Sequence, residues 1–141
     1  MKKAVSLIGV GIAMFLFVGL TSTSVNAQKG DRKPWVVPDK SKSVANPVKS
    51  NAETQEAGKA LYTKSCKSCH GVKGLGDGPK SKELDTPCGD FTKKEFTAQT
   101  DGEIFYKVKE GRDDMPSFKK KITDDNEIWQ IVTYVRTLGG K

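Results

Sequence analysis

Hydrophobic side chains recur at intervals of three or four residues in three stretches of the chain, and no stretch alternates polar and apolar residues as a half-buried strand does. The clearest stretch lies near the C-terminus and consists of Ile128, Ile131, Val132, Val135 and Leu138. Thr123 or Asp124 is placed to cap this helix at its start, and Gly139–Gly140 to end it. The pattern predicts an all-α fold.

Two earlier helices are predicted in the same way. Ser50 and Glu53 have the spacing of a capping box before a helix that runs into Cys66. Its apolar face is formed by Ala57, Ala60, Leu61 and Tyr62. Thr100 and Glu103 repeat the capping-box spacing before a middle helix that Gly111 should end. The apolar residues of this middle helix are Ile104, Phe105 and Val108.

The N-terminal residues resemble an export signal rather than part of the fold. Lys2 and Lys3 precede an apolar run from Ala4 to Leu20, and a small polar stretch then ends at Ala27. We expect residues 1–27 to be a cleaved signal peptide and the mature protein to be periplasmic. The alternative is an uncleaved anchor, because the apolar run is at the short end of a membrane-spanning helix.

The segment after the signal differs in composition from the rest. Residues 28–50 contain Pro34, Pro38 and Pro47 and no sustained periodicity, which predicts an extended N-terminal arm or linker. Residues 51–141 should then form one small domain. The formal charge of +7 falls to +5 once Lys2 and Lys3 are removed, so this domain is basic. Export and the lack of a recognition motif argue against nucleic acid as its partner.

The chemistry of the chain is concentrated in a C-x-x-C-H motif, Cys66 to His70. In this arrangement two thiols form thioether bonds to the vinyl groups of a heme, and the following histidine binds its iron. Two alternatives are weaker. A dithiol redox pair of the thioredoxin type would require a βαβ pattern, and a zinc site would need Cys66, Cys69, His70 and Cys88 together, with adjacent Cys69 and His70 on one metal. We therefore expect one covalently attached heme c.

The two axial iron ligands follow from the scarcity of suitable residues. His70 is the only histidine, and Met115 is the only methionine left once Met1 and Met14 leave with the signal. Met115 lies in a polar loop, an unusual place for a methionine that merely fills a core, and thioether sulfur is a suitable heme ligand. An iron held by both residues has no open position for a substrate. This predicts electron transfer rather than an enzyme.

These residues resemble the small bacterial class I c-type cytochromes, which are single-heme electron carriers. The resemblance covers residues 51–141 and implies three main helices and loops around the covalently bound heme. It also implies that Gly58 and Tyr62 cross the last helix near Ile131 and Tyr134, and that the carbonyl of Pro79 accepts a hydrogen bond from His70 Nδ1. Met115–Pro116 matches the methionine loop of the family.

Three further residues have more than one interpretation. Cys88 is the one cysteine outside the C-x-x-C-H motif. Its alternative roles are a small buried hydrophobic residue, a reactive thiol, a partner in an intermolecular disulfide, or another iron ligand. Arg112 and Trp129 are either donors to the heme propionates or ordinary surface and packing residues.

Lysines lie close in sequence to the heme-binding segments, and a ring of them would steer the domain onto acidic redox proteins. They are Lys64, Lys67, Lys73, Lys80, Lys82, Lys119, Lys120 and Lys121. The leading hypothesis is a monomeric periplasmic carrier that meets redox proteins, membrane complexes among them, transiently. The alternatives are a heme subunit permanently docked to a dehydrogenase, oxidase or reductase, with residues 28–50 as its tether, and a heme enzyme or gas sensor in which Met115 is displaced.

Overall fold

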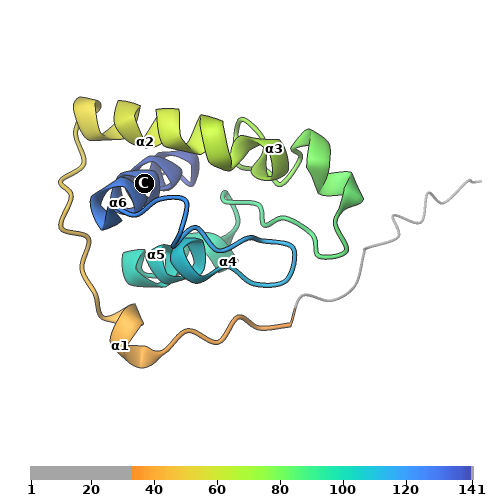
Figure 1. Ribbon diagram of the computed structural model, residues 1–141, viewed down its shortest axis with the longest axis horizontal. Coiled ribbons are helices and arrows are strands. Elements are labelled where there is room, and N and C mark those ends of the chain that lie inside the picture. The colour runs from red at the N-terminus through yellow and green to blue at the C-terminus, as the bar shows by residue number, and fades with distance from the viewer. Residues whose placement is uncertain (1–32, 141) are drawn as a thin grey trace, which may run out of the picture.

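A computed structural model describes residues 33–140 of the chain (Figure 1). The predicted signal peptide, 1–27, and the first five residues of the predicted arm lie outside the described residues. Within 33–140, no helix is both long and apolar enough to cross a membrane.

The described residues are helical, as the sequence pattern predicts. Three main helices, α2 (Ala52–Ser65), α5 (Asp101–Glu110) and α6 (Asp125–Leu138), are joined by long loops. Short helical turns punctuate the rest of the chain: α1 (Asp39–Lys42), α3 (Lys67–His70), the 3₁₀ turn η1 (Pro79–Glu83) and α4 (Lys94–Thr97). The only bridge of β type between residues 33 and 140 is an isolated one joining Arg112 and Met115. The all-α prediction is confirmed.

The caps predicted for α5 and α6 are confirmed, whereas the cap predicted for α2 is wrong by one residue. Asn51, not Ser50, has the extended backbone of a capping residue, and its side chain accepts a hydrogen bond of 2.9 Å from Thr54 N–H. Thr54 Oγ1 in turn accepts a 3.0 Å bond from Asn51 N–H. Asparagine with threonine therefore forms the same reciprocal pair that serine and glutamate would have formed one residue earlier.

Helices α2 and α6 cross at Gly58, as the family resemblance implies. A Cβ atom at Gly58 would lie 2.1 Å from the carbonyl oxygen of Gln130 and 2.9 Å from Tyr134 Cβ, so only glycine permits this approach. One turn further along α2, the ring of Tyr62 lies 5.3 Å from that of Tyr134. The crossing fixes the end of α2, where the C-x-x-C-H motif begins.

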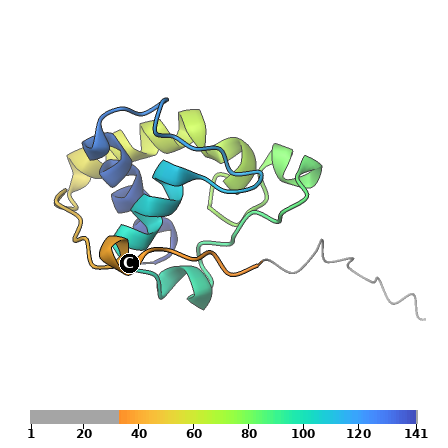
Figure 2. The same ribbon diagram turned by 60° about the horizontal axis from the view of Figure 1, so that its bottom comes forward.

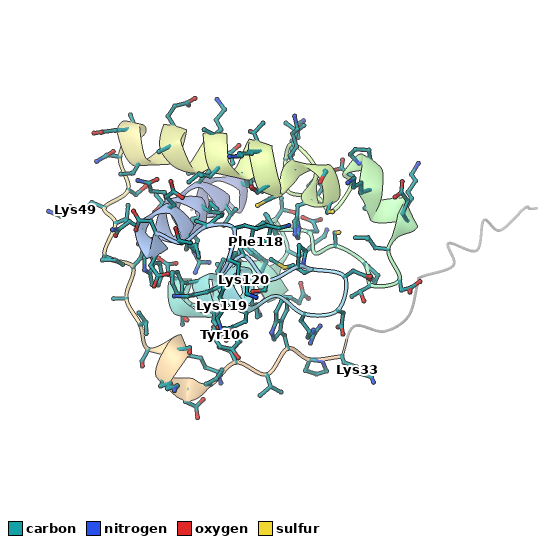
Figure 3. The ribbon with its side chains drawn as sticks, viewed as in Figure 1. Lys33, Lys49, Tyr106, Phe118, Lys119 and Lys120 are labelled. Atoms are coloured by element: carbon teal, nitrogen blue, oxygen red, sulfur yellow. The ribbon has the colours of Figure 1, made fainter. Side chains whose placement is uncertain are left out.

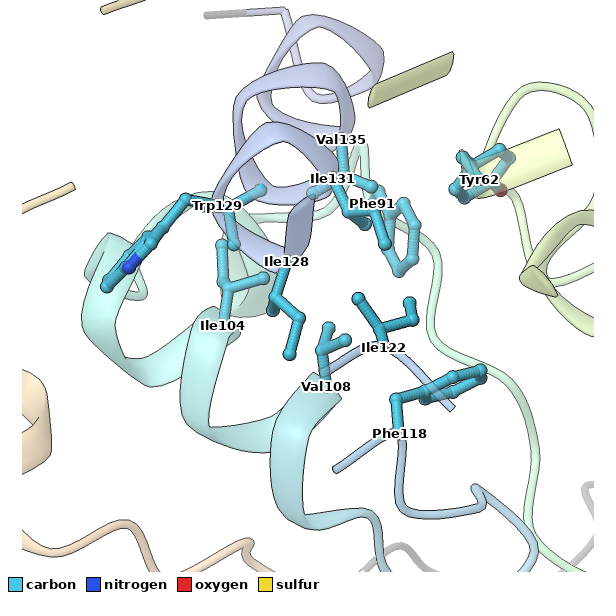
Figure 4. Close-up of a cluster of buried hydrophobic side chains, with 11 residues drawn as sticks. Tyr62, Phe91, Ile104, Val108, Phe118, Ile122, Ile128, Trp129, Ile131 and Val135 are labelled. Carbon is cyan, nitrogen blue, oxygen red and sulfur yellow. The ribbon is translucent and has the colours of Figure 1, made fainter. Parts of the chain in front are cut away.

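The hydrophobic core lies between α6, α5 and the loop that follows α5 (Figure 4). Ile128 and Val132 of α6 are fully buried, and Ile104 and Val108 of α5 lie beside Ile128. The remaining buried members come from all parts of the domain: Tyr62, Phe91, Phe118, Ile122, Trp129, Ile131 and Val135. Phe118 and Ile122 bring the segment after Met115 into this core.

Residues 33–50 run along the domain surface and contact α5 and α6 (Figure 2). Val37 is buried, and Thr100 Oγ1 donates a 2.8 Å hydrogen bond to the carbonyl of Lys42. A Cβ atom at Gly102 would lie 2.1 Å from the carbonyl of Ser41, so α1 and α5 are in backbone contact. Asn46 adds a 3.2 Å hydrogen bond to Thr133 of α6. The described part of the arm is therefore held at several points along its length.

Candidate heme site

The C-x-x-C-H motif occupies a single helical turn at the end of α2. The backbone N–H of Cys66 still bonds to Tyr62 in α2, and that of His70 bonds to the Cys66 carbonyl at 3.0 Å. Buried Tyr62 Oη donates a 2.6 Å hydrogen bond to the carbonyl of Gly71, just after the motif. This turn presents Cys66, Cys69 and His70 together, because α3 continues from α2 with only Cys66 between them.

The imidazole of His70 lies against the ring of Phe91, with 4.9 Å between ring centroids. Phe91 is buried and stacks on Phe96 at 4.3 Å, so the imidazole rests on an aromatic pair. His70 Nδ1 makes no hydrogen bond to the carbonyl of Pro79 in this structure, which corrects that part of the resemblance. Pro79 instead begins the 3₁₀ turn η1, with Gly78 N–H bonded to the Cys69 carbonyl at 3.2 Å.

A cavity of about 830 Å³ lies beside the motif turn, and Cys66, Cys69, His70 and Met115 all line it. Its apolar walls include Leu61, Leu84, Pro87, Pro116, Phe118 and Ile122. This volume is within the range of cofactor sites, roughly 300–1,000 Å³. The structure thus brings together the four site residues predicted from sequence, although Met115 is 45 positions after His70.

Met115 is held in a tight four-residue turn. The backbone N–H groups of Arg112 and Met115 bond reciprocally to each other's carbonyls, at 2.8 and 2.9 Å. Asp113, between them, has a φ of +51°, in the left-handed region that asparagine and aspartate tolerate better than most residues. Asp114 accepts a 2.8 Å hydrogen bond from Thr86 N–H, which ties the turn to the loop that carries Cys88. We refer to residues 112–115 as the Met115 turn.

The environment of Cys66 does not suit a dithiol redox site. Burial, with a smaller contribution from Cys69, raises the pKa of the Cys66 thiol to about 12. Reactive dithiols instead have lowered pKa values, because the thiolate is the nucleophile. No disulfide joins Cys66 to Cys69. Within residues 33–140, no three side chains of the His, Cys, Asp and Glu types gather as a metal-ion site would require.

The three residues that had several interpretations lie in different surroundings. Cys88 is half-buried and lines the cavity. Arg112 also lines the cavity, but its Nη1 donates 3.1 Å hydrogen bonds to the carbonyls of Lys33 and Pro34. Trp129 is buried and stacks on Phe105, with 4.1 Å between centroids, and it is not part of the cavity wall. Trp129 is therefore a packing residue.

Trp35 is the cavity residue that the sequence interpretation missed. It belongs to the arm, yet it lines the same cavity as Met115 and Arg112. The sequence did contain a signal for this contact. Trp35 is a large aromatic residue in an otherwise mostly polar arm, and burying such a side chain is favourable, so it was a candidate to pack against the domain.

Only part of the predicted lysine ring lies at the cavity. Lys64, Lys80 and Lys121 line it, together with Arg112, Asp114 and Glu127. Lys119 and Lys120 follow the Met115 turn on the surface (Figure 3), and Lys119 forms an ion pair with Glu110. The cavity wall thus carries four cationic and two anionic side chains, a positive balance.

The residues present fit a heme c. Two thiols from one helical turn, an imidazole and a thioether line one cavity that has apolar walls and more cationic than anionic side chains. Cys66 and Cys69 would attach the macrocycle, and His70 and Met115 would offer the nitrogen and sulfur donors that heme iron accepts.

Comparisons with known proteins agree with this geometry. Residues 53–135 match the family model described as "Cytochrome C oxidase, cbb3-type, subunit III". A search of curated proteins gives no match. Among solved structures, a chain of the reducing HAO-like protein complex Kustc0457/Kustc0458 of Kuenenia stuttgartiensis is 30% identical, with a TM-score of 0.60. The match covers 76% of this chain and 51% of that one, so this chain spans about half its length.

A second solved structure, the KustC0563 c-type cytochrome, is 32% identical with a TM-score of 0.51, over 57% of this chain and 95% of that one. The match to the HAO-like complex extends further toward the N-terminus than the family model does. Residues 53–141 make up less than two thirds of the chain, so a match covering 76% includes residues that precede Glu53. With the family model matching more than half of its residues, the chain belongs to the cytochrome c family of cbb3-type subunit III domains, which are electron-transfer heme proteins.

Proposed function

We propose that this protein is a single-heme electron carrier. Cys66 and Cys69 hold one heme c covalently, and His70 and Met115 are the axial ligands of its iron. The observation that supports this most strongly is that these four side chains line one cavity. When bound, the heme supplies an iron centre that gains or loses one electron.

The two proposed iron ligands determine whether the heme would transfer electrons or bind a substrate. His70 is held by the motif turn and Phe91, and Met115 by its reciprocal backbone bonds, so the two residues that would bind the iron both lie on supported elements. With both bound, the iron would have no open coordination position for oxygen or a substrate. Electrons must then enter and leave through the edge of the macrocycle, which favours a carrier over an enzyme.

We further propose that the protein works in the periplasm and docks on acidic redox proteins. The predicted signal peptide supports export, and c-type heme is attached outside the bacterial cytoplasm. Lys64, Lys80 and Lys121 at the cavity support attraction to acidic surfaces, because several like charges around a redox site steer encounters with partners of opposite charge.

A second candidate function is a heme subunit docked permanently in a redox complex. The match to a chain of an HAO-like protein complex favours it, since that match includes residues before Glu53 and therefore part of the arm. Size-exclusion chromatography of the protein from its own periplasm separates the two candidates. A carrier elutes as a small monomer, and a docked subunit elutes with its complex.

The experiment that tests the proposed function is a potentiometric titration of the purified holoprotein followed by its heme absorption. A single-heme carrier gives one transition that fits one electron per protein, and repeated oxidation and reduction leave it unchanged. Two transitions would show more than one heme. Turnover of oxygen or peroxide at the rate of a heme enzyme would contradict a carrier whose axial positions are both filled.

A further inference from the structure

We propose that Trp35 and Arg112 are positioning residues that clamp the Met115 turn to the N-terminal arm. The clamp keeps the turn closed over the cavity, holds Met115 on the iron and excludes other ligands. This inference rests on the proposed function, because it assumes that His70 and Met115 are the axial ligands.

The first half of the clamp is the contact between Arg112 and the arm. Arg112 Nη1 donates two hydrogen bonds of 3.1 Å, to the carbonyls of Lys33 and Pro34. The guanidinium carbon lies 4.6 Å from the centroid of the Trp35 ring, within the range of a cation–π contact. Asp113 holds Arg112 Nε at 3.0 Å, and the Arg112 side chain is only 25% exposed. Arginine is suited to this place because its planar fork can stack and donate at once.

The second half is the link from Arg112 to Met115. The two residues share both backbone hydrogen bonds of the Met115 turn. When Arg112 moves, the carbonyl and N–H that hold Met115 move with it. A sulfur atom carried on a free loop would leave the iron by loop opening, whereas here that opening must also break the contacts of Arg112 with the arm.

The arm is itself anchored, so Trp35 is a fixed point rather than a mobile side chain. Lys107 Nζ of α5 lies 5.6 Å from the Trp35 ring centroid, which places a second cation near the same ring. Two residues later, Val37 is buried with 4% of its surface exposed. The backbone contact of α1 with Gly102 holds the next turn of the arm. Trp35 and Met115 line the same cavity, so the arm forms part of the wall beside the proposed ligand.

The test measures how fast an external ligand replaces Met115 in the oxidised holoprotein. At saturating imidazole this rate equals the opening rate of the sulfur–iron bond. We expect Trp35→Ala and Arg112→Ala to raise it about tenfold while the heme remains attached. A tenfold change corresponds to about 1.4 kcal/mol, which is within the range of a cation–π contact and just below that of hydrogen bonds to charged groups.

Four control variants separate the clamp from other effects. Trp35→Phe keeps a ring under the guanidinium and should restore most of the slow rate, whereas Trp35→Leu, which keeps only apolar cover, should not. Val36→Ala changes the adjacent, 84% exposed side chain and should leave the rate unchanged. Lys120→Ala removes one positive charge from an exposed side chain that is not part of the cavity wall, so it controls for charge alone and should leave the rate unchanged.

Asn46→Ala supplies a control for general stability, because it breaks an arm contact with Thr133 that is remote from the Met115 turn. It should lower the stability toward denaturant without accelerating ligand entry. Amide hydrogen exchange gives a second readout. In the Trp35→Leu and Arg112→Ala variants, the amides of Arg112 and Met115 should lose protection while those in α6 keep it.

The outcomes distinguish the clamp from the proposed function. If the unmodified protein shows no spectroscopic sign of sulfur ligation, the proposed axial pair is wrong and the clamp fails with it. If sulfur ligation is present, but Trp35→Leu and Arg112→Ala bind imidazole at the original rate, the clamp alone is overturned. Equal acceleration by Asn46→Ala would also overturn it, because the effect would then be one of overall stability.

Discussion

Cys66 shows how a buried thiol can be suited to one reaction and unsuited to another. Its raised pKa leaves it protonated at neutral pH, which disfavours disulfide exchange, since the thiolate is the reacting form. A thiol that becomes a thioether loses its proton permanently, and burial then only adds apolar contact with the macrocycle. The environment of Cys66 therefore agrees with heme attachment better than with a redox dithiol.

A double variant tests this attachment. Cys66→Ser with Cys69→Ser should lose all heme on an acid denaturing gel, because no sulfur remains to bond to the vinyl groups. Cys88→Ser is the matched control, since it removes the third thiol of the same cavity, and it should retain the heme stain. Loss of the stain in Cys88→Ser, or its persistence in the double variant, would contradict the assignment.

Met115→Ala should leave the heme bound but open the sixth coordination position. We expect a high-spin iron, uptake of external ligands such as imidazole, and a lower reduction potential, because thioether ligation raises the potential of heme iron. Absorption spectra and a redox titration measure these effects. An unchanged spectrum and potential would show that another residue, with Cys88 or a lysine the nearest choice, binds the iron.

The close crossing of α2 and α6 is the contact between elements on which the site depends. Gly58→Ala should destabilise the holoprotein by about 1–3 kcal/mol, because the added methyl group would overlap the Gln130 carbonyl. The sign of the change in the free energy of unfolding tests the crossing. Alanine in a helix without such a clash is about 1 kcal/mol more stable than glycine. A denaturant titration that shows a gain in stability would mean that the two helices do not cross this closely.

The three main helices could be predicted from the sequence because each carries a local signal of periodic apolar residues and a cap. Thr100 with Glu103 and Asp124 are confirmed as caps, and only the start of α2 was off by one residue. The one-turn elements α1, η1 and α4 could not be predicted. Four or five residues are too few to show a helical period, and contacts such as that of α1 with Gly102 hold them.

At the scale of the whole molecule, the sequence predicts the site residues that a short motif or a unique residue type identifies, but not the contacts between distant segments. Cys66, Cys69 and His70 lie within five consecutive residues, and Met115 is the only methionine outside the predicted signal peptide, so these four could be predicted without any long-range information. Trp35 meets Arg112 from 77 positions away, and nothing local to either residue encodes that contact. The same reason explains why neither interpretation of Arg112, as a donor to the propionates or as a surface residue, included its bonds to the arm.

The charge distribution gives a further prediction about the whole surface. Reversing Lys80 and Lys121 to glutamate should slow oxidation of the reduced protein by anionic hexacyanoferrate(III) about tenfold at low salt, because both lysines lie at the cavity. The rate for the unmodified protein should also fall as salt rises, since exposed charges are screened beyond roughly 8 Å at physiological ionic strength.

Reversing Lys40 and Lys49 changes the net charge by the same amount on the exposed arm, and this control should have a much smaller effect. Lys49 lies before the start of α2, at the opposite end of that helix from Cys66 (Figure 3). Equal slowing in the two double variants would mean that only net charge matters and that the cavity lysines have no special role in docking.

The central claim, one covalent heme with His70 and Met115 on its iron, is tested most directly by the far-red absorption spectrum of the oxidised holoprotein. Sulfur bound to ferric heme iron gives a weak charge-transfer band in this region. We predict that the band is present, survives in Cys88→Ser and disappears in Met115→Ala. A spectrum without the band, or a band that persists in Met115→Ala, would contradict the claim.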